Sequence, residues 1–237
     1  MSMSVLKLLL DPSENVRLEA VRVISSSQDI LISLKEDQEI ILMFEAIFRC
    51  FWLTDQKQKQ FVISSIVHVF NGFRSLRLPP ARYLGPFLDV FDKNWPGIDR
   101  FRLNKYYELV ETILCSLNSL ELLEVAKQMH RRCSDLNYRC TGMMMRLFYV
   151  LSLSADKFKL EDSGLLTEYI LCLLDILAAR PQLSKDLDVI ATVNTCGETA
   201  KISSRLEHHL SQVSLPKGAR EILANIYAAL ESPAVSK

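Results

Sequence analysis

Apolar residues return every three or four positions along most of the chain, and this spacing is the strongest constraint on the fold. Segment 37–53 shows it clearly, with a single stripe made of Ile40, Ile41, Phe44, Ile47, Phe48, Phe51 and Trp52. Such spacing places side chains on one face of an α-helix. No window shows the alternation of β-branched residues that marks a half-buried strand. The sequence therefore predicts an all-α chain.

Capping and breaking residues divide the chain into consecutive helices. Asp11-Pro12-Ser13-Glu14 combines a cap, a proline for the first turn and an acid three positions after the cap. Thr54 and Asp55 offer another cap, and Trp95-Pro96-Gly97 forces a sharp corner. We expect helices over about 11–26, 37–53, 54–73, 81–93, 99–117, 119–133, 136–153, 163–180, 183–195, 198–213 and 217–230.

Tightly joined pairs of these helices give units of about 40 residues, which is the size of HEAT and armadillo repeats. We therefore expect antiparallel helix pairs stacked as a HEAT/armadillo-like α-solenoid. A single irregular helical bundle is the alternative, because no repeated motif is visible. Residues 1–237 should form one helical-repeat domain, with a candidate hinge in the polar stretch 154–163.

Charge and composition narrow the class of protein. The formal net charge is zero, which removes the simplest argument for nucleic-acid binding, so any basic surface must be local. The longest apolar stretch, 169–179, is far shorter than the roughly 20 residues of a bilayer span, and the N-terminus does not have the pattern of a secretory signal. Six cysteines in a chain of this size are expected to be reduced thiols of an intracellular protein.

The sequence shows no arrangement of residues typical of catalysis. Its seven glycines do not have the spacing of a phosphate-binding loop, and no Cys or Ser has the local pattern of a nucleophile. His130, Cys133 and Cys140 would suit zinc, but a fourth ligand is missing, and buried thiols are the simpler interpretation. We expect no enzyme activity, no cofactor and no metal.

The most informative polar residues are cations near the Trp95-Pro96-Gly97 corner. Between Gly72 and Tyr106, seven Lys or Arg stand against three Asp. Stacked helix pairs place alternate turns on the same edge, so these cations could form one ridge that binds phosphates. The alternative is that the three aspartates neutralise part of the set. The candidate RNA- or partner-binding residues are Arg74, Arg77, Arg82, Lys93, Arg100, Arg102 and Lys105.

Part of the corner has a purely structural explanation. Asp99 is placed to cap the next helix, Gly97 permits the turn, and Trp95 is a large anchor beside it. Trp52, near the end of the helix predicted over 37–53, is a further structural candidate. A cap does not require Arg100, Arg102 or Lys105, so we expect these three side chains to project outward as a docking surface.

Two segments carry a resemblance to a known family. Residues 95–107, Trp-Pro-Gly-Ile-Asp-Arg-Phe-Arg-Leu-Asn-Lys-Tyr-Tyr, resemble the signature of the eukaryotic nucleolar family called ribosomal RNA-processing protein 1. Residues 47–57, Ile-Phe-Arg-Cys-Phe-Trp-Leu-Thr-Asp-Gln-Lys, are similar to its other marker, a helix that ends in an aromatic residue and tryptophan before a polar turn. The resemblance covers about 37–114.

This resemblance implies a non-enzymatic ribosome assembly factor of the nucleus and nucleolus. It would act as a scaffold in precursor large-subunit particles and support pre-rRNA processing through RNA and protein contacts. The implied partners are precursor large-subunit ribosomal RNA, other assembly factors and ribosomal proteins, with no membrane and no small-molecule substrate. Family members commonly continue into a lysine-rich tail. The nonspecific affinity of this neutral chain for RNA should therefore be lower than that of members with such a tail. The alternative is a HEAT-like adaptor that binds proteins and not RNA.

Overall fold

The computed structural model describes residues 3–135, 137–154, 157–158, 163–184 and 199–231. Within these ranges every regular element is a helix, and no strand is present, which confirms the all-α prediction. None of the helices found there is long and apolar enough to cross a bilayer. The chain divides into two compact units, Met1–Ser116 and Leu117–Lys237, which we call unit 1 and unit 2.

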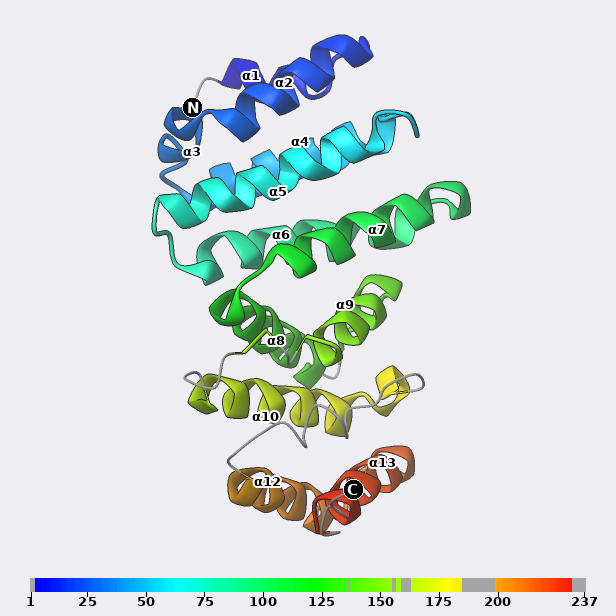
Figure 1. The fold of residues 1–237 in the computed structure, drawn as a ribbon. Helices are drawn as coiled ribbons and strands as arrows, with labels where there is room; N and C mark the ends of the chain where they lie inside the picture. Colours follow the sequence, from blue (N-terminus) through cyan, green and yellow to red (C-terminus); the bar gives the residue numbers. More distant parts are fainter. Residues whose placement is uncertain (1–2, 136, 155–156, 159–162, 185–198, 232–237) are drawn as a thin grey trace, which may run out of the picture. The chain divides into compact units, whose positions relative to one another are not determined.

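Unit 1 consists of two layers of helices that follow one another in the manner of a solenoid. Its elements are α1 Met3–Leu8, α2 Glu14–Ser26, α3 Gln28–Ile32, α4 Asp37–Leu53, α5 Lys59–Ser75, α6 Pro80–Asn94, the 3-10 turn η1 Trp95–Gly97, and α7 Arg100–Ser116 (Figure 1). In one layer α1 packs on α4 and α4 packs on α6. In the other layer α2 packs on α5 and α5 packs on α7.

Aromatic side chains join the two layers of unit 1. Phe44 of α4, Phe70 of α5 and Phe87 of α6 are all at most 1% exposed. The ring centroid of Phe44 lies 5.8 Å from that of Phe70 and 5.6 Å from that of Phe87. Phe70 meets Phe87 edge to face at 5.3 Å. Edge-to-face contacts of this kind add to the stabilisation from burial itself.

Unit 2 is built around α10. Its described elements are α8 Ser119–Ser134, α9 Gly142–Ser152, α10 Ser163–Ala179, η4 Pro181–Ser184, α12 Thr199–Ser211 and α13 Lys217–Glu231. Helix α10 packs against α8, α12 and α13. Its Asp175 carries a carboxylate oxygen 2.7 Å from Nε2 of His209 in α12.

Several helix starts differ from the sequence prediction. Asp11 does not cap α2: its Oδ1 accepts from the amide of Ser13 at 2.8 Å, and the helix begins at Glu14. Thr54 ends α4 instead of starting α5, because its Oγ1 donates to the carbonyl of Cys50 at 2.8 Å. Helix α9 begins at 142, where Thr141 caps it, and not at 136.

Other predicted features fall partly or mostly beyond the described residues. The helix expected over 183–195 lies mostly in 185–198, and the candidate hinge at 154–163 includes 155–156 and 159–162, all outside the described ranges. The hinge and the single-domain organisation stay predictions. The short helices α1 and α3 were not predicted, because five or six residues are too few to show a helical period.

Candidate functional site

Segments 47–57 and 95–107, distant in the sequence, meet at one edge of unit 1. Helix α4 ends at this edge, and the chain passes from α6 through η1 into α7 there (Figure 1). The hydroxyl of Tyr106 donates to the carbonyl of Phe48 at 3.0 Å, which ties the two segments directly. The cations and aromatic residues of both segments therefore belong to one site.

Lys105 lies inside unit 1, so the expectation that it projects outward is wrong. The residue is 6% exposed. Its ammonium donates to the carbonyls of Phe51, Trp52 and Thr54 at 2.6, 3.1 and 3.0 Å. These carbonyls lie at or just beyond the C-terminal end of α4, where helical N–H partners run out and positive charge is favoured. Lys105 therefore acts as a cap for α4.

Arg17 of α2 completes this cap, and the sequence analysis did not identify it. The residue is 6% exposed, and its Nη2 donates to the carbonyl of Leu53 at 3.1 Å. Its Nη1 bonds the carbonyls of Asp11 and Pro12 at 2.7 and 2.9 Å. The residues buried with it on α2 are Ala20, Val21 and Ile24. These residues follow Arg17 by three, four and seven positions, which is the spacing of one helix face, so the sequence does carry a signal that Arg17 lies on the buried face.

Aromatic packing fixes the start of α7 against α4. Tyr106 is fully buried, and its ring centroid lies 4.9 Å from that of Phe48 and 5.1 Å from that of Phe51. Burial raises the pKa of Tyr106 well above its usual value. Trp95 is 5% exposed and meets Tyr106 edge to face at 6.2 Å. Trp95 is therefore a buried anchor.

Asp99 caps α7, whereas Gly97 is not needed for its backbone freedom. Oδ1 of Asp99 accepts from the amides of Phe101 and Arg102, each at 3.0 Å, and Oδ2 bonds the Arg102 guanidinium. The hydrogen bond from the Arg102 side chain is the largest cause of the lowered pKa of Asp99. No described glycine has a positive φ, and a Cβ at Gly97 would meet nothing within 4 Å. The expectation that glycine permits this turn is therefore wrong.

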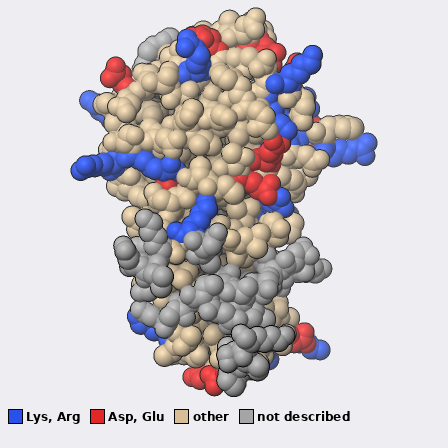
Figure 2. Space-filling model, in the orientation of Figure 1, with Lys and Arg blue, Asp and Glu red and all other residues tan. Residues whose placement is uncertain are grey.

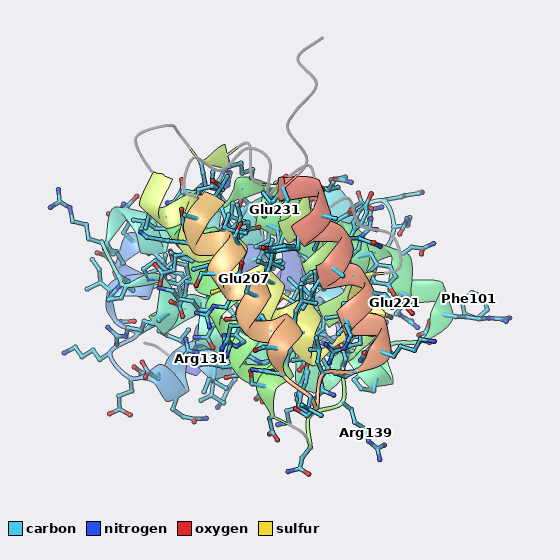
Figure 3. All side chains as sticks on the ribbon, turned by 90° about the horizontal axis from the view of Figure 1, so that it is seen from below. Phe101, Arg131, Arg139, Glu207, Glu221 and Glu231 are labelled. Carbon is cyan, nitrogen blue, oxygen red and sulfur yellow. The ribbon has the colours of Figure 1, made fainter. Side chains whose placement is uncertain are left out.

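The outward side of this edge carries an exposed aromatic residue between two arginines. Phe101 is 82% exposed and projects away from the helices (Figure 3). The guanidinium of Arg100 lies 4.8 Å from the Phe101 ring centroid, and that of Arg102 lies 5.0 Å from the ring of Trp52. The Arg102 side chain is 43% exposed. We call Trp52, Arg100, Phe101 and Arg102 the corner surface.

The seven candidate cations do not form one ridge. Arg74, Arg77 and Arg82 lie near the start of α6, whereas Arg100 and Arg102 follow its end. Helix α6 has 15 residues and is roughly 22 Å long, so it separates the two groups. On the visible face of unit 1, Lys and Arg side chains lie mainly at the two edges, with uncharged surface between them (Figure 2).

Several of the remaining candidates are engaged inside unit 1. Arg74 donates to the carbonyl of Ser116 at 2.9 Å, which places it on the end of α7. Nε of Arg82 lies 3.3 Å from the carboxylate of Asp37, and the same side chain bonds carbonyls in the loop before α4. The ammonium of Lys93 is 3.9 Å from Glu45. Arg77 is exposed and has a left-handed backbone, with φ of 54°.

The zinc ligands considered from the sequence are dispersed in unit 2. Cys133 is buried, Cys140 is half-buried, and Nε2 of His130 lies 3.9 Å from the carboxylate of Asp175. Among the residues whose placement is described, no three His, Cys, Asp or Glu side chains gather as a metal-binding group.

The buried ammonium of Lys105 gives unit 1 a pH dependence. Burial, aided by the charge of Arg102, lowers the pKa of Lys105 from 10.5 to about 8. Between these values the unfolded chain holds the proton more firmly than the folded chain, so the contribution of Lys105 to stability rises with pH. The thiol of Cys50 acts in the opposite direction, because burial raises its pKa to about 11.

We therefore expect the difference in unfolding free energy between the wild-type protein and Lys105→Met to grow as the pH rises through this window. Urea unfolding of both proteins at about pH 7.5 and about pH 9.5 measures it. Taking the difference removes the effect of burial on Cys50, which is the largest cause of its raised pKa and is common to both proteins. A difference that stays constant would show that Lys105 does not titrate in this range.

Comparison with known proteins agrees with the two marker segments. A family model described as "Nucleolar protein, Nop52" matches residues 3–153. Human ribosomal RNA processing protein 1 homolog A is 29% identical over 102 residues, covering 41% of this chain and 21% of that protein. Homolog B is 30% identical in human and 28% in mouse, each over 81 residues and 32% of this chain, and over 10% and 11% of those proteins.

The alignments thus cover a tenth to a fifth of the relatives' lengths, and only a minority of this chain. The family model covers much more, because it extends from α1 to the end of α9 and contains both marker segments. On this match the chain belongs to the Nop52 family of nucleolar proteins.

Proposed function

We propose that this protein is a non-enzymatic scaffold of ribosome biogenesis that supports the processing of precursor large-subunit rRNA. Its family is nucleolar, and the related proteins are named for ribosomal RNA processing. Stacked helix pairs present extended surfaces, which suits a protein that holds several partners at once. Assembly factors, ribosomal proteins and the precursor RNA are the proposed partners.

The observation that carries the RNA contact is the exposure of Phe101 between Arg100 and Arg102. Folding gains almost nothing from a phenylalanine that is 82% exposed. Unpaired bases stack on exposed aromatic rings and on guanidinium planes, while arginines also bind phosphates. The corner surface therefore has the chemistry of a single-stranded RNA contact.

The corner surface replaces the longer ridge as the proposed RNA contact. Lys105 is excluded because its ammonium is bonded to three carbonyls. Arg74 and Arg82 hold backbone carbonyls of unit 1. Arg77 and Lys93 are more exposed, but they lie outside the corner surface and serve as secondary candidates.

The test compares substitutions in the corner surface with a matched charge reversal elsewhere in unit 1. We expect Arg100→Glu and Phe101→Ala each to weaken binding of a labelled single-stranded RNA about tenfold, since stacking of one base is worth roughly 1–3 kcal/mol. Arg77→Glu makes the same charge change as Arg100→Glu at the other end of α6 and should have a much smaller effect. Fluorescence anisotropy measures the affinity, and circular dichroism checks the fold.

Equal losses of RNA affinity in Arg77→Glu and Arg100→Glu would contradict a local contact, because they would indicate only a general effect of net charge.

The second candidate function is an adaptor that binds proteins alone. The same exposed residues favour it, because arginine and aromatic side chains dominate protein interfaces. Crosslinking in cells separates the two. RNA joined to the corner surface supports the scaffold, and protein crosslinks there without RNA support the adaptor.

A further inference from the structure

An apolar groove lies between α1 and α4. Leu6, Leu10, Leu42 and Ala46 line it, and the charged side chains of Lys7, Glu45 and Arg49 surround it. Its volume is about 170 Å³. An apolar cavity of about 150 Å³ is large enough to hold benzene, so the groove can accept a leucine- or phenylalanine-sized side chain.

The exposure of the lining residues indicates an open groove with a buried floor. Leu6 and Ala46 are 8% and 6% exposed, whereas Leu10 and Leu42 are 41% and 38% exposed. The two exposed leucines both line the groove, so they form one apolar surface with its floor. Covering them would remove further apolar area from water, at about 25 cal/mol for each Å².

The charges around the groove favour one sign of partner. Neither Lys7 nor Arg49 has a hydrogen bond or ion pair from its side chain to any described residue. Glu45, the acidic residue of the lining, has the ammonium of Lys93 at 3.9 Å. Within the described part of the chain, the groove is therefore flanked by two positive charges that have no ion-pair partner, and carboxylates on a partner would complement them.

We propose that this groove binds a short amphipathic helical segment of a partner protein, with apolar residues on one face and acidic residues beside them. An amphipathic helix presents side chains at i, i+3, i+4 and i+7 to such a groove. The lining is aliphatic and offers no ring for base stacking, so a peptide fits it better than RNA. The groove shares no residue with the corner surface, and this proposal does not rest on the RNA contact.

The test uses two labelled helical peptides of about 16 residues with the same leucine stripe, one flanked by Glu and the other by Lys. We expect the full chain to bind the Glu peptide at least tenfold more tightly in fluorescence anisotropy. Leu42→Glu should weaken this binding tenfold or more, and Arg49→Glu should abolish the preference for the Glu peptide. Ile32→Glu is the matched control, because Ile32 is 55% exposed on α3.

Four results would overturn the proposal. The first three are binding of neither peptide, equal binding of both peptides, and an equal loss in Ile32→Glu and Leu42→Glu. Self-association of the chain that disappears in Leu42→Glu would instead assign the groove to a second copy, and this too would overturn it. Leu42→Glu should retain the RNA affinity of the wild-type chain, so failure of one proposal can be told from failure of the other.

Discussion

Replacing Lys105 by methionine should lower the free energy of unfolding of unit 1 by about 3 kcal/mol. The substitution keeps an unbranched side chain but leaves the carbonyls of Phe51, Trp52 and Thr54 without the donor that now bonds them. Each buried carbonyl left without a donor costs roughly 1–3 kcal/mol, and three of them together outweigh what is gained by no longer burying the ammonium. The end of α4 should loosen.

Urea unfolding followed by tryptophan fluorescence suits this measurement, because the only two tryptophans of the chain, Trp52 and Trp95, are both in unit 1. Lys57→Met is the matched control. Lys57 is exposed in the turn after α4, so the same chemical change there should shift stability by less than about 0.5 kcal/mol. Equal midpoints for Lys105→Met and Lys57→Met would refute the capping role.

Replacing Phe70 by alanine should destabilise unit 1 by about 4 kcal/mol. Phe70 is fully buried on α5, and its ring contacts Phe44 of α4 and Phe87 of α6. The two layers therefore share this ring. Removing it loses the transfer free energy of the benzyl group and leaves a cavity that three helices cannot easily close.

Phe101→Ala is the matched control, because it deletes the same atoms from a residue that is 82% exposed. It should change the unfolding free energy by less than about 0.5 kcal/mol. The same fluorescence measurement compares the two proteins. If Phe101→Ala were as destabilising as Phe70→Ala, Phe101 would be structural, and its proposed role in binding RNA would lose its basis.

The role of Lys105 changes how charge reversal at the corner has to be interpreted. The sequence alone suggests reversing Arg100, Arg102 and Lys105 together, with no effect on helix content or melting. The structure contradicts that expectation, because a carboxylate at Lys105 would face the carbonyls that the ammonium now bonds. Only the substitutions at Arg100 and Phe101 test binding separately from folding.

Local interactions explain why much of the helical framework could be predicted. Helix α4 runs over 37–53 as expected, because its apolar stripe lies within the segment and its start is fixed locally, where Glu39 accepts from the amide of Glu36 at 3.1 Å. Asp99 caps α7 for the same reason: its carboxylate reaches amides two and three residues ahead. Such interactions depend only on neighbouring residues, so the sequence by itself determined the all-α class and most helix positions.

The tertiary structure alone decided which cations face water. Lys105 and Arg102 are three residues apart on α7, yet Lys105 is buried on the end of α4 and Arg102 is partly exposed beside Trp52. Arg17 was overlooked because its acceptor, the carbonyl of Leu53, is 36 residues away. Helix ends leave carbonyls unpaired, and whichever cation the packing brings near will bond them. That choice depends on contacts between distant segments, which the helical period does not specify.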